Sequence, residues 1–507
     1  MGNQILAYDL GTGGVKASVY DEAGKSIAES FVSYDTYYPE SGYHEQNPLD
    51  WWNAIVTSTK TLLKNFSINN KNILCIAVSG HSLGVVPIGI DGELLYEKVP
   101  IWSDSRALNQ TQKFFERVSQ KEWYLTTGNG FPAPLYSIFK LMWFKDNLPK
   151  VYEKAAKFIG TKDYINYRLT GRLYTDHSYA SGSGVYDLKA RVYKKDFIEN
   201  AGISEDKFPE IIPSTEIIGK ILPEAAKMLG LSENVKVACG GVDNACMALG
   251  AGCVADGMVY TSLGSSAWIA VSGHEPIVDI QNKPYVFAHC IPGMFVSSTA
   301  IFSAGSSFRW LRDTVCRNLL NEKEPYDAMT QLAAQSIVGA NKLIFNPSLA
   351  GGSNLDKSPD IKGGFIGLLL GHTQSDLIRA VMEGVCLNLK IALDVMECYT
   401  PLSDDMLLVG GGGRSRFWRS LFADIYNKNI VETNIGQDAG SLGAASVAAV
   451  GIGLWRDFNI VPSLHVVKSR IEPVKENCEK YEIILGLFKR IAEIQADIGG
   501  IIEKKDW

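Results

Sequence analysis

The run ILAYDLGTGGVKASVYD at residues 5–21 indicates how the fold of this chain begins. Residues 5–10 are apolar up to a carboxylate near their end and predict a β-strand, and residues 15–21 predict the strand that returns beside it. Between them, residues 11–14 supply three glycines and a threonine for a tight turn. Such a turn can direct backbone N–H groups and a hydroxyl at one anion, because glycine permits positive φ and close approach. The alternative for these residues is an ordinary hairpin turn.

A second segment repeats this design. Residues 258–271, MVYTSLGSSAWIAV, again read as strand, tight polar turn and strand, although Ser262 stands where the first segment has Asp9. A third glycine-rich turn occupies residues 410–413 after another strand-like run. The repeat is short enough to arise by chance; if it is real, the chain has two related halves that offer hairpin turns to one ligand. Three such turns would suit a nucleoside triphosphate, and the chain has no GxxxxGK[ST] motif.

The composition limits the class of protein. A length of 507 residues predicts at least two domains, and the mixture of strand-like and helix-like segments predicts an α/β fold. With 46% apolar and 21% charged residues the chain is typical of globular proteins. The net charge of −6 without a basic block argues against a nucleic-acid partner.

The same composition argues against a membrane protein and a secreted one. The N-terminus has no cationic segment followed by an apolar run, so we expect a cytoplasmic protein. The uncharged run at residues 439–455 is rich in small residues and predicts a closely packed buried helix rather than a membrane span. The nine cysteines form no CxxC pair, which favours buried thiols in a reducing compartment.

The run CGGVDNACMALG at residues 239–250 places a carboxylate in apolar surroundings. A buried aspartate is costly unless it is paired or used, so Asp243 predicts a functional site. The alternative is a structural one, in which Asp243 caps a helix that starts near Asn244. The two glycines before it would let the backbone approach a ligand closely.

Several motifs follow one another in an order that resembles the FGGY carbohydrate kinases over nearly the whole chain, with the closest likeness to the xylulose kinases. They are KLMWFKDN (140–147), GGFIGLLLGHTQSDLIRAVMEG (363–384), DLGTGGVK (9–16), IWSDSR (101–106), TKDYINYRLTG (161–171), GGVDN (240–244), SLGSS (262–266) and GGGGRSRFW (410–418).

The resemblance implies the architecture. We expect two actin-like, ribonuclease-H-like domains with a ligand cleft between them. Residues 1–247 would form the domain that binds sugar and carries the catalytic aspartate. Residues 248–507 would form the domain that binds most of the nucleotide.

The resemblance also implies the roles of single residues. Asp243 matches the catalytic base that accepts the proton of the sugar hydroxyl, and Asp9 matches the acid that handles the Mg²⁺ bound with ATP. The expected ATP-binding residues are Thr12, Gly13, Lys16, Gly264, Ser265, Gly305, Gly411, Gly412 and Arg414.

The sugar site is where the chain departs from the family. Xylulose kinases typically carry Met-His, and glycerol kinases Arg-Glu, where this chain has Ser82 and Leu83. A leucine cannot hydrogen-bond to a hydroxyl, so glycerol is disfavoured as a substrate. The expected substrate-binding residues are His81, Ser82, Trp102, Asp104, Asp243 and Asn244. A structural His81 and a core-packing Trp102 are the alternatives.

The sequence therefore predicts ATP- and Mg²⁺-dependent phosphorylation of a small sugar, with a ketopentose such as D-xylulose favoured and another ketose, a polyol or a sugar acid as alternatives. An actin-like nucleotide switch without sugar turnover is the alternative from another class. Loose GxGxxA matches raise an NAD-dependent dehydrogenase as a weaker one. The expected partner is a small-molecule sugar, and the sequence does not decide between a monomer and a homodimer.

Overall fold

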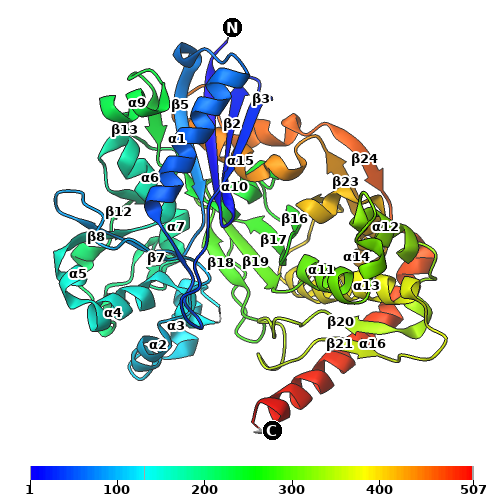
Figure 1. Cartoon of the computed structure of the whole chain (residues 1–507). Coiled ribbons are helices and arrows are strands. Elements are labelled where there is room, and N and C mark those ends of the chain that lie inside the picture. The colour runs from blue at the N-terminus through cyan, green and yellow to red at the C-terminus, as the bar shows by residue number, and fades with distance from the viewer. Residues whose placement is uncertain (1, 131, 505–507) are drawn as a thin grey trace. The chain divides into compact units, whose positions relative to one another are not determined.

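The computed structural model describes residues 2–130 and 132–504, which form two compact units (Figure 1). The first unit comprises the residues up to Val254 together with Ser272–Ser297 and Asp438–Leu464. The second comprises Ala255–Val271, Ser298–Gln437 and the residues from His465 onward. These units follow packing and are discontinuous along the chain, so the domain boundary expected after residue 247 remains a prediction.

The first unit is built on a seven-stranded sheet. Six strands have the order β13-β14-β5-β1-β2-β3, and β15 extends the line of β14 beside β5. Strands β1, β2 and β3 are antiparallel neighbours, whereas β5 runs parallel to β1, β14 and β15. The strands are β1 (Gln4–Gly11), β2 (Gly14–Asp21), β3 (Ser26–Ser33), β5 (Ile73–Gly80), β13 (Ile217–Lys220), β14 (Lys236–Ala238) and β15 (Gly241–Val242).

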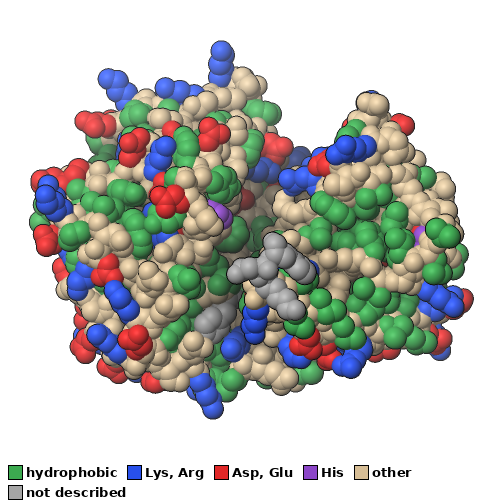
Figure 2. Space-filling view, turned by 60° about the horizontal axis from the view of Figure 1, so that its bottom comes forward, with side chains coloured by type: hydrophobic (Ala, Val, Ile, Leu, Met, Phe, Trp, Pro, Cys, Tyr) green, Lys and Arg blue, Asp and Glu red, His purple; other side chains and the backbone are tan. Residues whose placement is uncertain are grey.

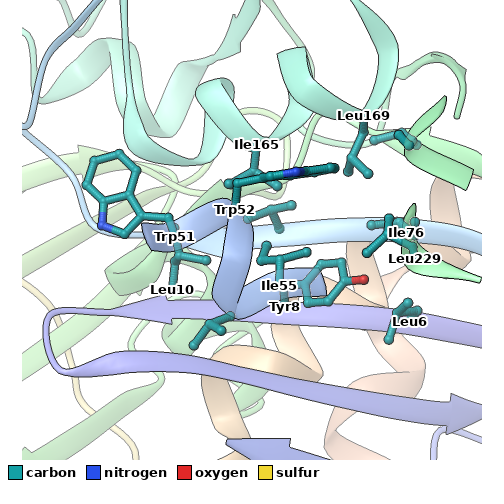
Figure 3. Close-up of a cluster of buried hydrophobic side chains, with 14 of the residues drawn as sticks. Leu6, Tyr8, Leu10, Trp51, Trp52, Ile55, Ile76, Ile165, Leu169 and Leu229 are labelled. Carbon is teal, nitrogen blue, oxygen red and sulfur yellow. The ribbon is translucent and has the colours of Figure 1, made fainter. Parts of the chain in front are cut away.

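Alternation along β1 divides its side chains between the two faces of this sheet. Figure 3 shows Leu6, Tyr8 and Leu10 in one buried cluster with side chains of α1 (Pro48–Asn65) and α6 (Thr161–Thr170). Asp9 therefore points to the opposite face, where α15 (Ala439–Gly451) packs against β1 and β5. The strand thus presents a carboxylate to a helix that begins with small residues.

Helices α10 (Asp243–Gly250) and α15 pack through glycines. A methyl group at Gly443 would overlap the carbonyl oxygen of Cys246, and one at Gly250 would overlap that of Ala439. The uncharged run that begins at residue 439 forms this buried helix, as predicted. Among the residues that the structure describes, no helix is both long and apolar enough to cross a membrane.

The second unit repeats the strand pattern of the first. Its sheet contains the order β19-β17-β16-β22-β23-β24, in which β16 is antiparallel to β17 and parallel to β22. This matches β3-β2-β1-β5, so the short sequence repeat reflects a repeated topology. The strands are β16 (Val259–Leu263), β17 (Ala267–Gly273), β19 (Phe295–Ile301), β22 (Asp405–Val409), β23 (Asn429–Thr433) and β24 (Val467–Ile471). The helices discussed below are α11 (Gly305–Thr314), α13 (Gln374–Glu397), α14 (Arg416–Tyr426) and α16 (Lys475–Glu503).

The surface is mixed in charge. Figure 2 shows acidic and basic side chains interspersed over the face in view, without a continuous basic field. This agrees with the net charge of −6.

Two helical glycines test the packing of α15 against α10. Gly443→Ala should lower the free energy of unfolding by about 2 kcal/mol, since the new methyl group meets backbone that cannot rotate away. Gly486→Ala in α16 should raise it by about 1 kcal/mol, since nothing lies within 4 Å of the new methyl group and alanine favours the helix. Denaturant unfolding of both variants measures the two signs, and a stabilised Gly443→Ala protein would contradict the packing.

Candidate active site

Parallel strand pairing brings the predicted acids to one edge of the first unit's sheet. Asp9 of β1 lies opposite Ser79 of β5, and Ser79 lies opposite Gly241 of β15. Asp243 follows β15 directly and is the first residue of α10. The carboxyl ends of parallel strands are the usual place for ligand sites in open α/β sheets.

Asp9 is held on both sides. The Ser79 hydroxyl donates a hydrogen bond of 2.7 Å to Oδ1. A methyl group at Gly440, in the first turn of α15, would lie 2.5 Å from Oδ2, so glycine is needed for this approach. Burial raises the pKa of Asp9, and the Ser79 hydrogen bond and the charge of Lys16, which lies opposite in β2, only partly offset it.

Asp243 is partly buried and has a raised pKa. Burial raises it from 3.8 to about 7, and the nearby charge of Asp9 adds to the shift. The backbone N–H of Asn244 donates a hydrogen bond of 2.8 Å to Oδ1, which opposes the shift. A carboxylate that titrates near neutral pH is suited to accept a proton from a hydroxyl.

A buried network braces the backbone that leads to Asp243. The Val242 N–H donates to the Ser178 hydroxyl over 2.9 Å, and that hydroxyl in turn donates to Asp176. Lys162 lies between Asp176 and Asp163, with Nζ–O distances of 3.0 and 2.6 Å.

This network contains one cation and two carboxyl groups. Burial disfavours the ammonium of Lys162, but the two carboxylates outweigh burial and raise its pKa. Burial alone would raise the pKa of Asp176, yet the charge of Lys162 lowers it. Removing Lys162 would leave two buried carboxyl groups without their cation. Lys162 and Asp163 belong to the motif at residues 161–171, but the sequence of this motif does not reveal that they support the backbone before Asp243.

Two predicted sugar-binding residues have buried polar atoms without a partner. His81 is 1% exposed, and neither ring nitrogen has a hydrogen-bond partner among the described residues. Burial lowers its pKa to about 3, and the charge of Lys140 acts in the same direction, so the ring is neutral. Asn244 Oδ1 is also buried and without a partner among the residues described. His81 follows Gly80, which pairs with Val242, so both residues lie at the edge that carries Asp243.

Ser82 and Trp102, two further predicted sugar-binding residues, differ in burial. Ser82 is buried in the loop that follows β5. Trp102 is 37% exposed, so it is not a core residue, and its indole N–H donates to the Thr12 hydroxyl over 2.9 Å. This bond joins a predicted sugar residue to a predicted phosphate turn.

Asp104 is used internally. It is fully buried, and Oδ1 accepts hydrogen bonds from the backbone N–H and Nε of Arg106. Oδ2 accepts from the second guanidinium nitrogen of Arg106 and from the His44 N–H, each over 2.7 Å. These four bonds use the acceptor positions of a carboxylate, so the structure gives no support to its expected bond to a sugar hydroxyl.

The turn between β1 and β2 is fixed at its base and open at its tip. The Gln46 side chain donates to the Thr12 carbonyl oxygen over 2.7 Å, and Tyr34 donates to that of Gly11. A methyl group at Gly13 would meet nothing within 4 Å. Lys16 is engaged in ion pairs with Asp438 and, over 3.2 Å, with Glu29.

The remaining predicted nucleotide residues gather in the second unit. The N–H groups of Gly305 and Ser306, at the start of α11, donate to the carbonyl oxygens of Gly264 and Ser265 over 3.0 Å. Gly412 packs on the Leu263 side chain, where a methyl group would overlap it. A methyl group at Gly411 would lie 4.0 Å from the side-chain nitrogen of Gln437. The Arg414 guanidinium donates a hydrogen bond of 2.7 Å to the side-chain oxygen of Gln437.

The sequence matches two family descriptions that cover most of its length. Residues 4–250 match the N-terminal domain, and residues 259–452 the C-terminal domain, of the FGGY family of carbohydrate kinases. The chain belongs to this family. It is therefore a carbohydrate kinase, and the resemblance noted in its motifs is confirmed.

Similar proteins differ in the substrate that they are named for. A xylulose kinase from Staphylococcus epidermidis is 30% identical over 499 residues, which cover 97% of this chain and 98% of the relative. Crystal structures of a gluconate kinase and of a ligand-bound xylulose kinase, both from Lactobacillus acidophilus, each have a TM-score of 0.91 and 27% identity. They cover 99% of this chain and 99% and 100% of theirs, which confirms the expected two-domain α/β fold.

The raised pKa of Asp243 gives a stability prediction. The folded protein retains this proton to about pH 7, whereas the unfolded chain loses it near 3.8, so stability falls as pH rises between these values. Asp243→Asn removes this loss and should gain up to about 4 kcal/mol over the wild type above pH 7, but little at pH 4. Thermal unfolding between pH 4 and 8 measures the difference. Asp35→Asn, in an exposed loop, is the control, and a difference independent of pH would contradict the shift.

Proposed function

We propose that this protein transfers the γ-phosphoryl group of ATP to a hydroxyl of a small neutral sugar, with a ketopentose such as D-xylulose as the substrate. The observation that carries this proposal is that Asp243 and His81 lie at the same sheet edge. The pKa of Asp243 is about 7, and the neutral ring of His81 has no hydrogen-bond partner among the described residues. Asp243 can accept a proton near neutral pH. The neutral His81 ring can donate one hydrogen bond and accept another.

In the proposed reaction Asp243 accepts the proton of the sugar hydroxyl. The hydroxyl oxygen forms a bond to the γ-phosphorus, the bond to the β-phosphate oxygen breaks, and ADP leaves with that oxygen. Phosphoryl transfer depends mainly on positioning and charge stabilisation, so a fixed base is more useful than a strong one. The Lys162–Asp176–Ser178 network supplies this fixation from behind Val242.

The described residues fit Mg-ATP. Asp9 offers carboxylate oxygens, the ligand type that Mg²⁺ prefers, beside the open turn at Gly13. When bound, Mg²⁺ would neutralise phosphate charge. We assign phosphate binding to Thr12, Gly13, Lys16, Gly264 and Ser265. The nucleoside side is assigned to Gly305, Gly411, Gly412 and Arg414.

Three buried cations of the first unit, Arg106, Lys162 and Lys140, make contacts within the protein. Arg106 is paired with Asp104 and Glu45, and Lys162 with Asp163 and Asp176. Lys140 is held by three backbone carbonyls. Arg106 Nη1, however, is buried without a hydrogen-bond partner among the described residues, so these contacts do not separate a neutral sugar from a sugar acid. The likeness to a gluconate kinase makes gluconate the second candidate.

A substrate panel tests the proposal. ADP release from Mg-ATP should be stimulated by D-xylulose more than by other ketoses, polyols, aldoses or gluconate. Asp243→Ala should reduce this turnover at least about 100-fold, the usual range for losing a general base, while ATP binding persists. Turnover with gluconate alone would show that D-xylulose is the wrong substrate assignment and would leave the proposed mechanism unchanged. ATP binding without stimulation by any compound would favour a nucleotide switch instead.

Asp9 is tested through the metal. Asp9→Asn should lower turnover roughly 100-fold and raise the Mg²⁺ concentration needed for half-maximal rate, since a charged ligand is lost. Sugar-dependent rates over a Mg²⁺ titration measure both effects, with Asp35→Asn as the control. A wild-type titration curve for the Asp9→Asn protein would refute the metal assignment.

A further inference from the structure

Lys140 of α4 (Ser137–Asn147) is a fully buried lysine that forms no ion pair with any described carboxylate. Its ammonium instead donates three hydrogen bonds to backbone carbonyl oxygens. The acceptors are Leu83, Ile101 and Leu135, at 3.0, 2.8 and 2.6 Å. Burial of the charge lowers the pKa of Lys140 to about 7. A buried ammonium is costly, so its three bonds need an explanation beyond packing.

The first acceptor lies in a strained turn. Leu83 has a φ of +62°, which is uncommon outside glycine, and the Gly84 N–H donates to the Ser82 carbonyl oxygen over 2.7 Å. This is a γ-turn with positive φ, a conformation that persists only where the surroundings impose it. The Leu83 carbonyl oxygen is held by Lys140 and, over 3.2 Å, by the Ser137 hydroxyl.

The turn fixes the residues proposed to contact sugar. His81 and Ser82 immediately precede Leu83 in the loop after β5. The second acceptor, Ile101, immediately precedes Trp102, whose indole reaches Thr12. One ammonium therefore ties together the two loops that carry the proposed sugar-binding residues, and anchors both to α4.

We propose that Lys140 is a positioning residue for sugar: it holds the Leu83 turn and the Ile101 carbonyl so that His81, Ser82 and Trp102 are in place before substrate arrives. This inference rests on the proposed kinase function. It assigns Lys140 no contact with sugar or nucleotide, since its three donors are already used. Loss of the clamp should therefore affect sugar binding and leave nucleotide binding unchanged.

Lys140→Met keeps the length of the side chain and removes the donors. It should raise the KM for sugar at least about tenfold, with the KM for ATP within about twofold of wild type, because a displaced sugar loop loses roughly one hydrogen bond to substrate. Lys145→Met, the same change at an exposed position of the same helix, should alter neither constant. Hydrogen exchange of the peptide that contains Gly84 should be faster in Lys140→Met than in Lys145→Met.

Ser137→Ala provides a milder test if Lys140→Met does not fold. It removes the second donor to Leu83 and should raise the sugar KM about threefold, again with ATP unaffected. The proposal is overturned if a folded Lys140→Met protein keeps its sugar KM within about twofold of wild type, or loses sugar and ATP affinity equally. A lower melting temperature with unchanged kinetics would also overturn it.

Failure of the kinase proposal has a different signature. Wild-type protein would then show no sugar-stimulated ADP release, and hydrogen exchange would still test the clamp. Unchanged exchange at Gly84 in Lys140→Met would overturn the clamp whatever the activity.

Discussion

The site depends on the parallel pairing of β1, β5 and β15. This pairing places Asp9, Ser79 and Gly241 side by side and sets the start of α10, with Asp243, at the same edge. The two carboxylates are then close enough for the charge of Asp9 to raise the pKa of Asp243. The surrounding fold holds the two carboxylates near each other despite this repulsion. The glycine contacts between α10 and α15 and the buried network around Lys162 contribute to this.

Two buried lysines stabilise this site by different means. Lys162 is neutralised by two carboxylates and keeps a raised pKa, as expected for a structural ion pair. Lys140 donates its hydrogen bonds to backbone carbonyls, and burial lowers its pKa although the charge of Asp104 opposes this shift. The first supports the strand that leads to the proposed base. The second, in our proposal, supports the loops that would contact the sugar.

Much of this arrangement could be predicted from sequence because it depends on local patterns. The strands predicted at residues 5–10 and 15–21 lie within one residue of β1 and β2, since a run of apolar residues and the glycines of the turn mark them. The internal repeat predicted the shared topology of the two sheets. The raised pKa of Asp243 agrees with the expectation that a carboxylate in apolar surroundings is unusual.

The sequence does not reveal contacts between residues that are far apart along the chain and that folding brings together. The hydrogen bond from the His44 N–H to Asp104, for example, joins residues that are 60 positions apart in the sequence. The positive φ of Leu83 has no sequence signal, since glycine would have been expected there. The roles proposed for Asp9, Asp243 and the other site residues still rest on the family resemblance and on this geometry.

The most direct test of the account is the ionisation of Asp243 itself. Infrared difference titration of wild type against Asp243→Asn isolates the carbonyl band of this one protonated carboxyl group. The account predicts that the band disappears with a midpoint near pH 7. A carboxyl group that is already ionised at about pH 5, near the usual range of an aspartate, would contradict the electrostatic basis of the site.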